Sequence, residues 1–305
     1  MILRRRELKA ARRMTGKERR WIDPSRGLLK VLERQMDLVV SRFLYPRMQG
    51  IWNPYSRQLA RRFSVGEISV SPGGWPRGLP ALKVLLISDI HAGIFLTPEV
   101  LSEIVRSLME LRPDLVAVAG DVVTGRAGDL DGLLMCLAPL SRAPLGGWYC
   151  FGNHDYFGGD ADDIRERLDR IGITTLRNES VVLTHGNGGF VLGGIDDRLL
   201  GTPSWDQLLS EDGPPHLLLA HHPDFFYEAE AHSIPLTLSG HTHGGQIRLP
   251  NGRPLVRQSK FCLDEGAYAH DASLLIVSRG LGSVGLPWRY GADPEAVLIE
   301  VTPPA

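Results

Sequence analysis

Eight short apolar segments, rich in Val, Leu and Ile, dominate the sequence after residue 80. They are KVLLIS (83–88), DLVAVAG (114–120), GWYCFG (147–152), FVLGGI (190–195), HLLLA (216–220), PLTLSG (235–240), SLLIVS (273–278) and AVLIEV (296–301). Segments of this length and composition predict buried β-strands. Residues 98–112 and 160–172 show helical spacing between them, and such alternation predicts an α/β domain. Because eight strands are too many for one short doubly wound sheet, we expect two packed sheets.

Five of these apolar segments are followed at once by Asp, Asn or His. The polar residues are Asp89 and His91, then Asp121, then Asn153 and His154, then His221 and His222, and finally His241 and His243. In α/β sheets ligands bind beyond the carboxyl ends of the strands, so we expect these side chains to share one pocket. Six of the ten histidines lie at these five places, which random scatter does not explain.

The types of side chain in this set indicate metal binding. Carboxylate and amide oxygens together with imidazole nitrogens suit Mn²⁺, iron or Zn²⁺, and no thiolate accompanies them. About seven ligands exceed the three or four that one zinc ion needs, and they suit two ions about 3.5–4 Å apart that share a carboxylate. Glycines beside the ligands permit close approach of the backbone and positive φ angles. The sequence therefore predicts a dinuclear metal site.

The first 70 residues differ from the rest of the chain in charge. They contain 17 Lys and Arg against 6 Asp and Glu, whereas the remainder contains 17 against 29. Within residues 25–45 an apolar stripe recurs at helical spacing among basic residues. We therefore predict a basic N-terminal arm with an amphipathic helix over residues 1–70, a Gly- and Pro-rich linker over 71–80, and a domain over 81–305.

The N-terminal arm has three possible binding partners, and its sequence also indicates where in the cell the protein is located. Residues 25–55 can bind an anionic membrane surface, pack on the domain or contact a second subunit. The arginines near the start are followed by AARRMTGKERRW rather than by an apolar segment, so an export signal is not expected. No run of 18 or more apolar residues predicts a spanning helix. We expect a cytoplasmic protein, either free or peripheral on the cytoplasmic face of the membrane.

The order D-x-H, G-D, G-N-H-D, H and G-H-T-H over residues 81–301 resembles the calcineurin-like metallophosphoesterases. The resemblance implies a four-layer α/β/β/α sandwich of two mixed sheets with flanking helices, and two divalent ions (Mn²⁺, iron or Zn²⁺) at the sheet ends. The implied ligands are Asp89, His91 and His243 for one ion, Asn153, His221 and His241 for the other, and Asp121 for both. His222 would lie behind them.

The resemblance also implies catalytic and substrate-binding residues. His154 would contact the substrate phosphate and protonate the leaving oxygen, Asn153 would also bind the substrate, and Asp121 would be catalytic through the two ions that it shares. Many members have G-D-x-x-D, whose second Asp orients this histidine, but here Thr124 takes that place. A neutral Thr cannot stabilise an imidazolium as a carboxylate does, so either Asp155 or Asp196 compensates or His154 acts mainly as a hydrogen-bond donor. Arg248, close to the last motif, is a further candidate for contacting the phosphate.

The C-terminal stretch SRGLGSVGLPWRYGADPEAVLIEV and the run GHTHGGQIRLP resemble a bacterial membrane-associated subgroup of these enzymes. That likeness implies hydrolysis of a phosphodiester or pyrophosphate by metal-activated water, on a lipid substrate such as UDP-2,3-diacylglucosamine. The alternatives are a soluble phosphomonoesterase, a protein phosphatase or a nuclease. A nuclease is disfavoured because the arm lacks a nucleic-acid-binding motif. A non-catalytic metal-binding scaffold is disfavoured because such a site would be expected to lose ligands, and none is missing.

Overall fold

The eight apolar segments all form strands at their expected places. They correspond to β4 (Leu82–Ile87), β5 (Leu115–Ala119), β6 (Gly147–Cys150), β9 (Gly188–Gly194), β10 (Leu217–Leu219), β11 (Leu236–Ser239), β13 (Ser273–Val277) and β14 (Glu295–Val301). Six further strands are β1 (Arg4–Glu7), β2 (Arg12–Arg13), β3 (Ser64–Val70), β7 (Ile173–Leu176), β8 (Glu179–His185) and β12 (Gly266–His270). The structure, a computed structural model, describes residues 4–9, 11–14, 54–93, 95–209 and 213–304.

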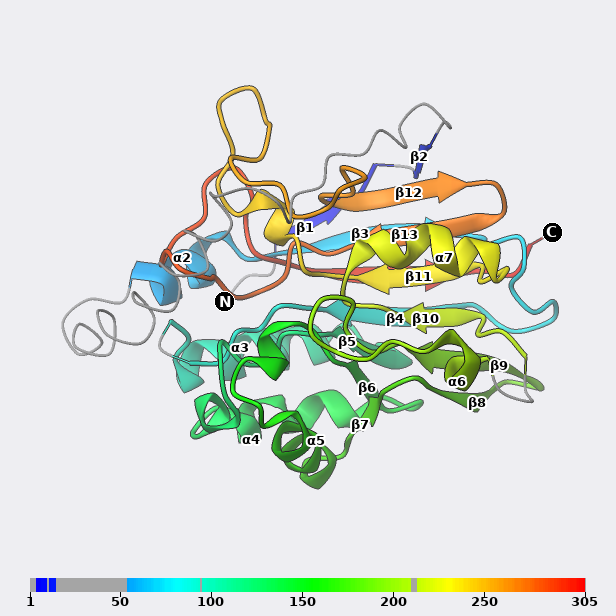
Figure 1. Ribbon diagram of the computed structural model, residues 1–305, viewed down its shortest axis with the longest axis horizontal. Coiled ribbons are helices and arrows are strands. Elements are labelled where there is room, and N and C mark those ends of the chain that lie inside the picture. The colour runs from blue at the N-terminus through cyan, green and yellow to red at the C-terminus, as the bar shows by residue number, and fades with distance from the viewer. Residues whose placement is uncertain (1–3, 10, 15–53, 94, 210–212, 305) are drawn as a thin grey trace.

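These strands form two seven-stranded sheets that lie face to face between helices (Figure 1). Sheet A has the order β1-β3-β14-β4-β5-β6-β7, and sheet B has the order β2-β12-β13-β11-β10-β9-β8. Both are mixed, because β14 runs antiparallel to β4, β12 to β13 and β8 to β9, whereas the remaining pairs are parallel. The helices are α2 (Pro54–Arg62), α3 (Pro98–Met109), α4 (Leu134–Leu137), α5 (Ala161–Arg170), α6 (Trp205–Leu208) and α7 (Phe226–Ala231).

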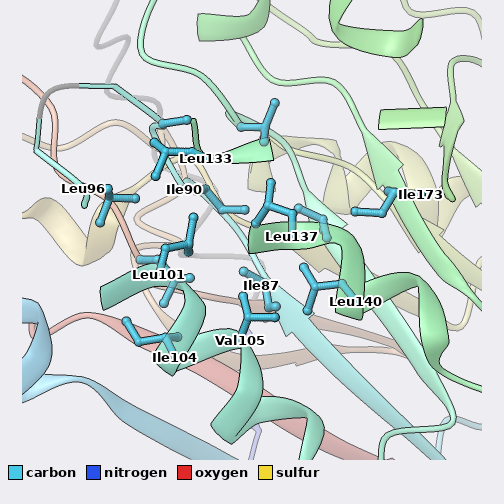
Figure 2. Close-up of a cluster of buried hydrophobic side chains, with 14 of the residues drawn as sticks. Ile87, Ile90, Leu96, Leu101, Ile104, Val105, Leu133, Leu137, Leu140 and Ile173 are labelled. Atoms are coloured by element: carbon cyan, nitrogen blue, oxygen red, sulfur yellow. The ribbon is translucent and has the colours of Figure 1, made fainter. Parts of the chain in front are cut away.

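Alternation of side chains along the strands produces the four layers. Ile87 of β4 points to the outer face of sheet A, where it packs with the helices α3 and α4 (Figure 2), and Leu85 belongs to the same core. Val84 and Leu86 point the other way and meet sheet B in a second apolar core between the sheets. Leu218 of β10 points to the opposite face of sheet B and packs beneath α6 and α7. The predicted α/β/β/α sandwich of two mixed sheets is therefore confirmed.

The predicted boundary after residue 70 is wrong, because earlier residues are part of the sandwich. Strand β3 lies within sheet A, with β14 on one side and β1 on the other. Strand β2 adds to the edge of sheet B by pairing with β12. Tyr55, Leu59 and Phe63 from α2 and the residue after it are buried in the core on the outer face of sheet A.

The amphipathic helix predicted over residues 25–45 lies outside the described residues, as does nearly all of the segment 25–55 that was considered for membrane binding. Of the helices that the structure describes, none combines the length and the hydropathy needed to span a bilayer.

Candidate metal centre

The loops that follow five parallel strands meet at one end of the two sheets. Sheet A supplies the loops after β4, β5 and β6, and sheet B supplies those after β10 and β11. Backbone hydrogen bonds tie neighbouring loops together: the N–H of Asp89 donates to Gly120 O and the N–H of His91 to Asp121 O, both at 3.0 Å. The parallel strands therefore bring polar residues that are far apart in sequence to one place.

Asp89, His91 and His243 form the first group of side chains. Each offers a ligand atom within 4.8 Å of the others, and all three are buried. The Nε2 atoms of His91 and His243 are 3.0 Å apart, and His243 Nε2 lies 3.4 Å from Asp89 Oδ1. Two ligands at about 2.1 Å from one ion lie roughly 3.0 Å apart at a right angle and roughly 3.4 Å apart in a tetrahedron. These separations fit side chains that share one ion.

Asp121, His221 and His241 form the second group, also buried and within the same mutual distance. His221 Nε2 lies 3.0 Å from Asp121 Oδ2. The Nδ1 of His221 lies 2.8 Å from the carbonyl of Ala119, and a carbonyl only accepts, so this nitrogen carries the hydrogen and Nε2 is left as the ligand atom. Asn153 is buried nearby in the motif, and its Oδ1 has no hydrogen-bond partner among the described residues. A buried acceptor without a donor is consistent with an oxygen atom that binds a cation.

Five of the proposed ligands have backbone angles that L-residues rarely adopt. The φ angles are +48° at Asp89, +47° at His91, +54° at Asp121, +72° at His241 and +51° at His243. Such conformations cost about 1–3 kcal/mol each and cluster at functional sites, where the surrounding structure holds them. The concentration of this strain in one pocket supports its assignment as the functional site.

Two glycines allow the ligands to approach one another, as the sequence predicted. A Cβ at Gly152 would lie 2.2 Å from Asp121 Oδ1. A Cβ at Gly120, whose φ is +81°, would lie 2.4 Å from His221 Nδ1. Any side chain at these positions would displace a proposed ligand.

Burial and neighbouring charges set the protonation of the proposed ligands. Burial lowers the pKa of His91 well below its usual value, and burial together with the Arg289 guanidinium does the same for His243. Both imidazoles are therefore neutral and able to bind a cation. Burial alone would lower the pKa of His221 too, but the Asp121 carboxylate outweighs it and raises that pKa to about 10. The raised pKa means that the charges around His221 favour a cation at this place. A metal ion would have to replace the proton on the same nitrogen.

His154 is held by a main-chain carbonyl rather than by a carboxylate. Its Nδ1 lies 2.7 Å from Thr124 O, and its backbone N–H donates to Asp121 Oδ1 at 2.8 Å. Because the carbonyl accepts, Nδ1 carries the hydrogen and Nε2 points away from Thr124. The residue that replaces the expected aspartate thus still orients the imidazole, but through its backbone.

The expectation that Asp155 or Asp196 compensates for Thr124 is wrong. The Asp155 carboxylate is buried and accepts from the backbone N–H groups of Gly152, Asp121 and Val122, at 2.7, 3.1 and 3.0 Å. The Asp196 carboxylate accepts from the Tyr156 hydroxyl and pairs with Arg177. Asp155 therefore fixes the loop that carries Asp121, and neither carboxylate is bonded to His154.

Arg289 lies beside the proposed ligands, and the sequence did not point to it. Its side chain is buried, and Nη2 lies 2.9 Å from His243 Nδ1. The same guanidinium donates to Gly282 O at 2.8 Å and to Arg279 O at 2.6 Å. The Tyr55 hydroxyl also donates to Gly282 O, at 2.9 Å. A His243 that binds an ion through Nε2 carries its hydrogen on Nδ1, and a guanidinium only donates, so Arg289 contacts the ring without a hydrogen bond and instead fixes the loop carbonyls behind His243.

The other two sequence candidates lie beside the pocket with partners of their own. Arg248 donates to Gly244 O at 2.7 Å and forms a 2.7 Å ion pair with Glu265, so its contact with a substrate phosphate stays a prediction. His222 accepts from the backbone N–H of Asp224, and its ring packs against His241 with centroids 4.2 Å apart.

Comparison with known proteins agrees with this geometry. The sequence pattern of the family described as calcineurin-like phosphoesterase matches residues 82–245. The chain is 33% identical over 230 residues to the uncharacterized metallophosphoesterase YkuE of Bacillus subtilis, covering 73% of this chain and 80% of YkuE. It is 33% identical over 225 residues to the phosphodiesterase YaeI of Escherichia coli, covering 72% of this chain and 82% of YaeI. The chain therefore belongs to the calcineurin-like phosphoesterases, metal-dependent hydrolases of phosphoester bonds.

Proposed function

We propose that the protein is a phosphodiesterase that works with two divalent ions held by the two groups of ligands. The observation that carries this proposal is the position of Asp121. Its Oδ2 lies 3.0 Å from His221 Nε2 in one group and 3.8 Å from His91 Nε2 in the other. One carboxylate oxygen thus faces ligands of both groups, as a residue shared by two ions must.

The chain's own residues would divide the work as follows. Asp89, His91 and His243 would hold one ion, Asn153, His221 and His241 the other, and Asp121 both. When bound, the ions supply Lewis acidity and a water activated for attack on phosphorus. His154 has its Nδ1–H fixed on Thr124 O. Its Nε2 is therefore the atom that would donate a proton to the leaving oxygen.

His154 would act mainly by position and by hydrogen bonding. A carbonyl dipole fixes the tautomer of the imidazole but supplies less than a full negative charge to stabilise an imidazolium. The Thr124 side chain contributes little to this, because its hydroxyl donates to His91 O at 3.2 Å rather than to His154. A leaving group that needs less protonation would therefore suit this centre best.

The finer assignment concerns the substrate. We favour a phosphodiester or pyrophosphate over a monoester, which the name of the relative YaeI supports. The basic composition of residues 1–70 is consistent with an amphiphilic substrate such as UDP-2,3-diacylglucosamine, reached from the cytoplasmic face of the membrane through residues 25–55. The metals would be Mn²⁺, iron or Zn²⁺, since the ligand set contains no thiolate.

The test compares bis-(p-nitrophenyl) phosphate with p-nitrophenyl phosphate as substrates of metal-stripped protein reloaded with Mn²⁺. We expect a preference for the diester. Asp121→Asn should abolish turnover of both substrates, because an amide shares two cations poorly. Asp169→Asn, at an exposed position on α5, is the matched control and should keep wild-type activity.

Two outcomes would contradict the proposal. Activity of Asp121→Asn equal to that of Asp169→Asn would exclude a centre that depends on a shared carboxylate. A preference for the monoester would replace the phosphodiesterase by a phosphomonoesterase that uses the same ligands.

A further inference from the structure

Three extended segments form a small patch of their own next to the loop that carries His241 and His243. This hairpin patch consists of residues 246–249, 253–255 and 288–290. Ile247 pairs with Tyr290, and Arg248 pairs with Pro254, as isolated β-bridges. The N–H of Arg248 donates to Tyr290 O and the N–H of Leu255 to Ile247 O, both at 2.8 Å. The hairpin is the light-orange loop that protrudes from the rest of the molecule in Figure 1.

The inner face of the hairpin patch supports the metal centre. Arg248 reaches Gly244 O, and Arg289 reaches His243. Pro254 packs so closely on Gly245 that a Cβ there would lie 2.4 Å from the proline Cβ. Side chains alternate between the two faces of an extended chain, so the neighbours of these residues point the other way.

The outer face of the hairpin patch is apolar and exposed. Leu249 is 44% exposed, Leu255 58%, Trp288 43% and Tyr290 58%. Paired residues of adjacent strands share a face, which places Ile247 between Leu255 and Tyr290. Among the described residues only eight large apolar side chains are this exposed, and four of them are here. Such a concentration marks an interaction surface rather than scattered surface residues.

Arginines lie on two sides of this apolar face. Arg253 is exposed and lies opposite Leu249, whose N–H donates to Arg253 O. Helix α2 adjoins the third segment of the patch, because Gln58 accepts from the N–H of Arg289 at 2.8 Å. Arg57 and Arg61 are exposed on that helix. Leu, Trp and Tyr side chains flanked by arginines are the composition with which proteins bind anionic bilayer interfaces.

We propose that the hairpin patch docks on the surface of an anionic lipid bilayer. Its outer face enters the interface while its inner face holds His243 and the loop behind it, so the metal centre lies beside the lipid headgroups. The lipid character of the substrate rests on the proposed function, but docking itself requires no turnover.

The test is co-sedimentation of the full chain with vesicles of phosphatidylcholine, with and without about 30% phosphatidylglycerol. We expect binding that depends on the anionic lipid. Leu249→Glu and Leu255→Glu should each raise the lipid concentration for half-binding roughly tenfold, because an acidic group is repelled where a basic one is attracted. Val182→Glu is the matched control, since Val182 is 53% exposed on β8, away from the patch. All three variants should hydrolyse bis-(p-nitrophenyl) phosphate normally.

Fluorescence locates the contact directly. Brominated lipids should quench the wild type more than Trp288→Phe, because Trp288 would enter the interface. Equal vesicle binding by Leu255→Glu and Val182→Glu, or equal quenching with and without Trp288, would overturn the proposal. So would a dimer in sedimentation velocity that Leu255→Glu dissociates, because the face would then bind protein. If the wild-type protein bound vesicles but did not hydrolyse the diester, the proposed function would be overturned and the proposed docking surface would stand.

Discussion

Replacing Arg289 by Met tests whether a buried guanidinium fixes the loop behind the proposed metal ligand His243. Met has a similar length and no charge, so the substitution removes the donors with little change of shape. The lost hydrogen bonds are those to Gly282 O and Arg279 O, and the 2.9 Å contact between the guanidinium and the His243 ring is lost as well. Gly282 O keeps its bond from the Tyr55 hydroxyl, whereas the side chain of His243 loses its neighbour.

The expected magnitudes follow from these contacts. A buried carbonyl that loses its donor costs about 1–3 kcal/mol, and bonds from charged donors are at the upper end. We therefore expect the free energy of unfolding to fall by about 2–5 kcal/mol. Removing a partner that orients a metal-binding histidine lowers metal affinity about 10–100-fold. That loss should fall on the ion held by Asp89, His91 and His243, and the other ion should be retained.

The assay is titration calorimetry with Mn²⁺, combined with the metal content after equilibration at limiting metal. Arg279→Met is the matched control, because Arg279 is also a buried arginine, but its guanidinium pairs with Glu295 at 3.0 Å rather than with a carbonyl of the loop behind His243. It should lose stability and bind both ions normally. If Arg289→Met also bound both ions with wild-type affinity, Arg289 would be a fold residue only and the reasoning would be refuted.

Three further predictions concern the same centre. His154→Asn should lower kcat about 10²–10⁴-fold for a diester with a poor leaving group and far less for a nitrophenyl ester. Thr124→Val should leave kcat nearly unchanged for both substrates. Steady-state kinetics of both variants on both substrates would check these values. Burial raises the pKa of Asp89 to about 6, so metal affinity should fall steeply below that pH, where the carboxyl is protonated. Above it affinity should still rise with pH, because His221, whose pKa is about 10, must lose its proton to bind a cation, as calorimetry from roughly pH 5 to 8 would show. Gly152→Ala should abolish turnover by displacing Asp121, and its metal content should drop in parallel.

The sequence predicted the part of the fold that depends on apolar burial. Strands with both faces covered need continuous apolar segments, and all eight were recognised by that signal. Strand β1 was missed because it reads RRRE and lies at a sheet edge, where pairing is by backbone alone. Strand β3 lies within the stretch that net charge predicts to be a separate basic arm, and charge says little about strand pairing.

For the candidate site too, the sequence predicts one part and not the other. The proposed ligands follow strands and carry side chains of a recognisable chemistry, so their order in the sequence was enough to predict that they would meet. The sequence does not indicate that the Thr124 carbonyl orients His154, because every residue has a backbone carbonyl. Arg289 lies 46 residues from His243 and reaches it only through the path of the C-terminal loop. Contacts made by the backbone, or by residues outside the motifs, required the structure.

The link from α2 to the metal centre explains why the N-terminal residues belong to the domain. Ligands with positive φ keep their strained backbone only while neighbouring contacts hold it. The loop Arg279–Gly282 is one such support, because a Cβ at Gly280 would lie 2.6 Å from Asp89 Cβ. That loop is held by Arg289 and by the Tyr55 hydroxyl, and Tyr55 is fully buried on α2. The stretch that charge alone assigned to a separate arm thus stabilises the backbone of a proposed metal ligand.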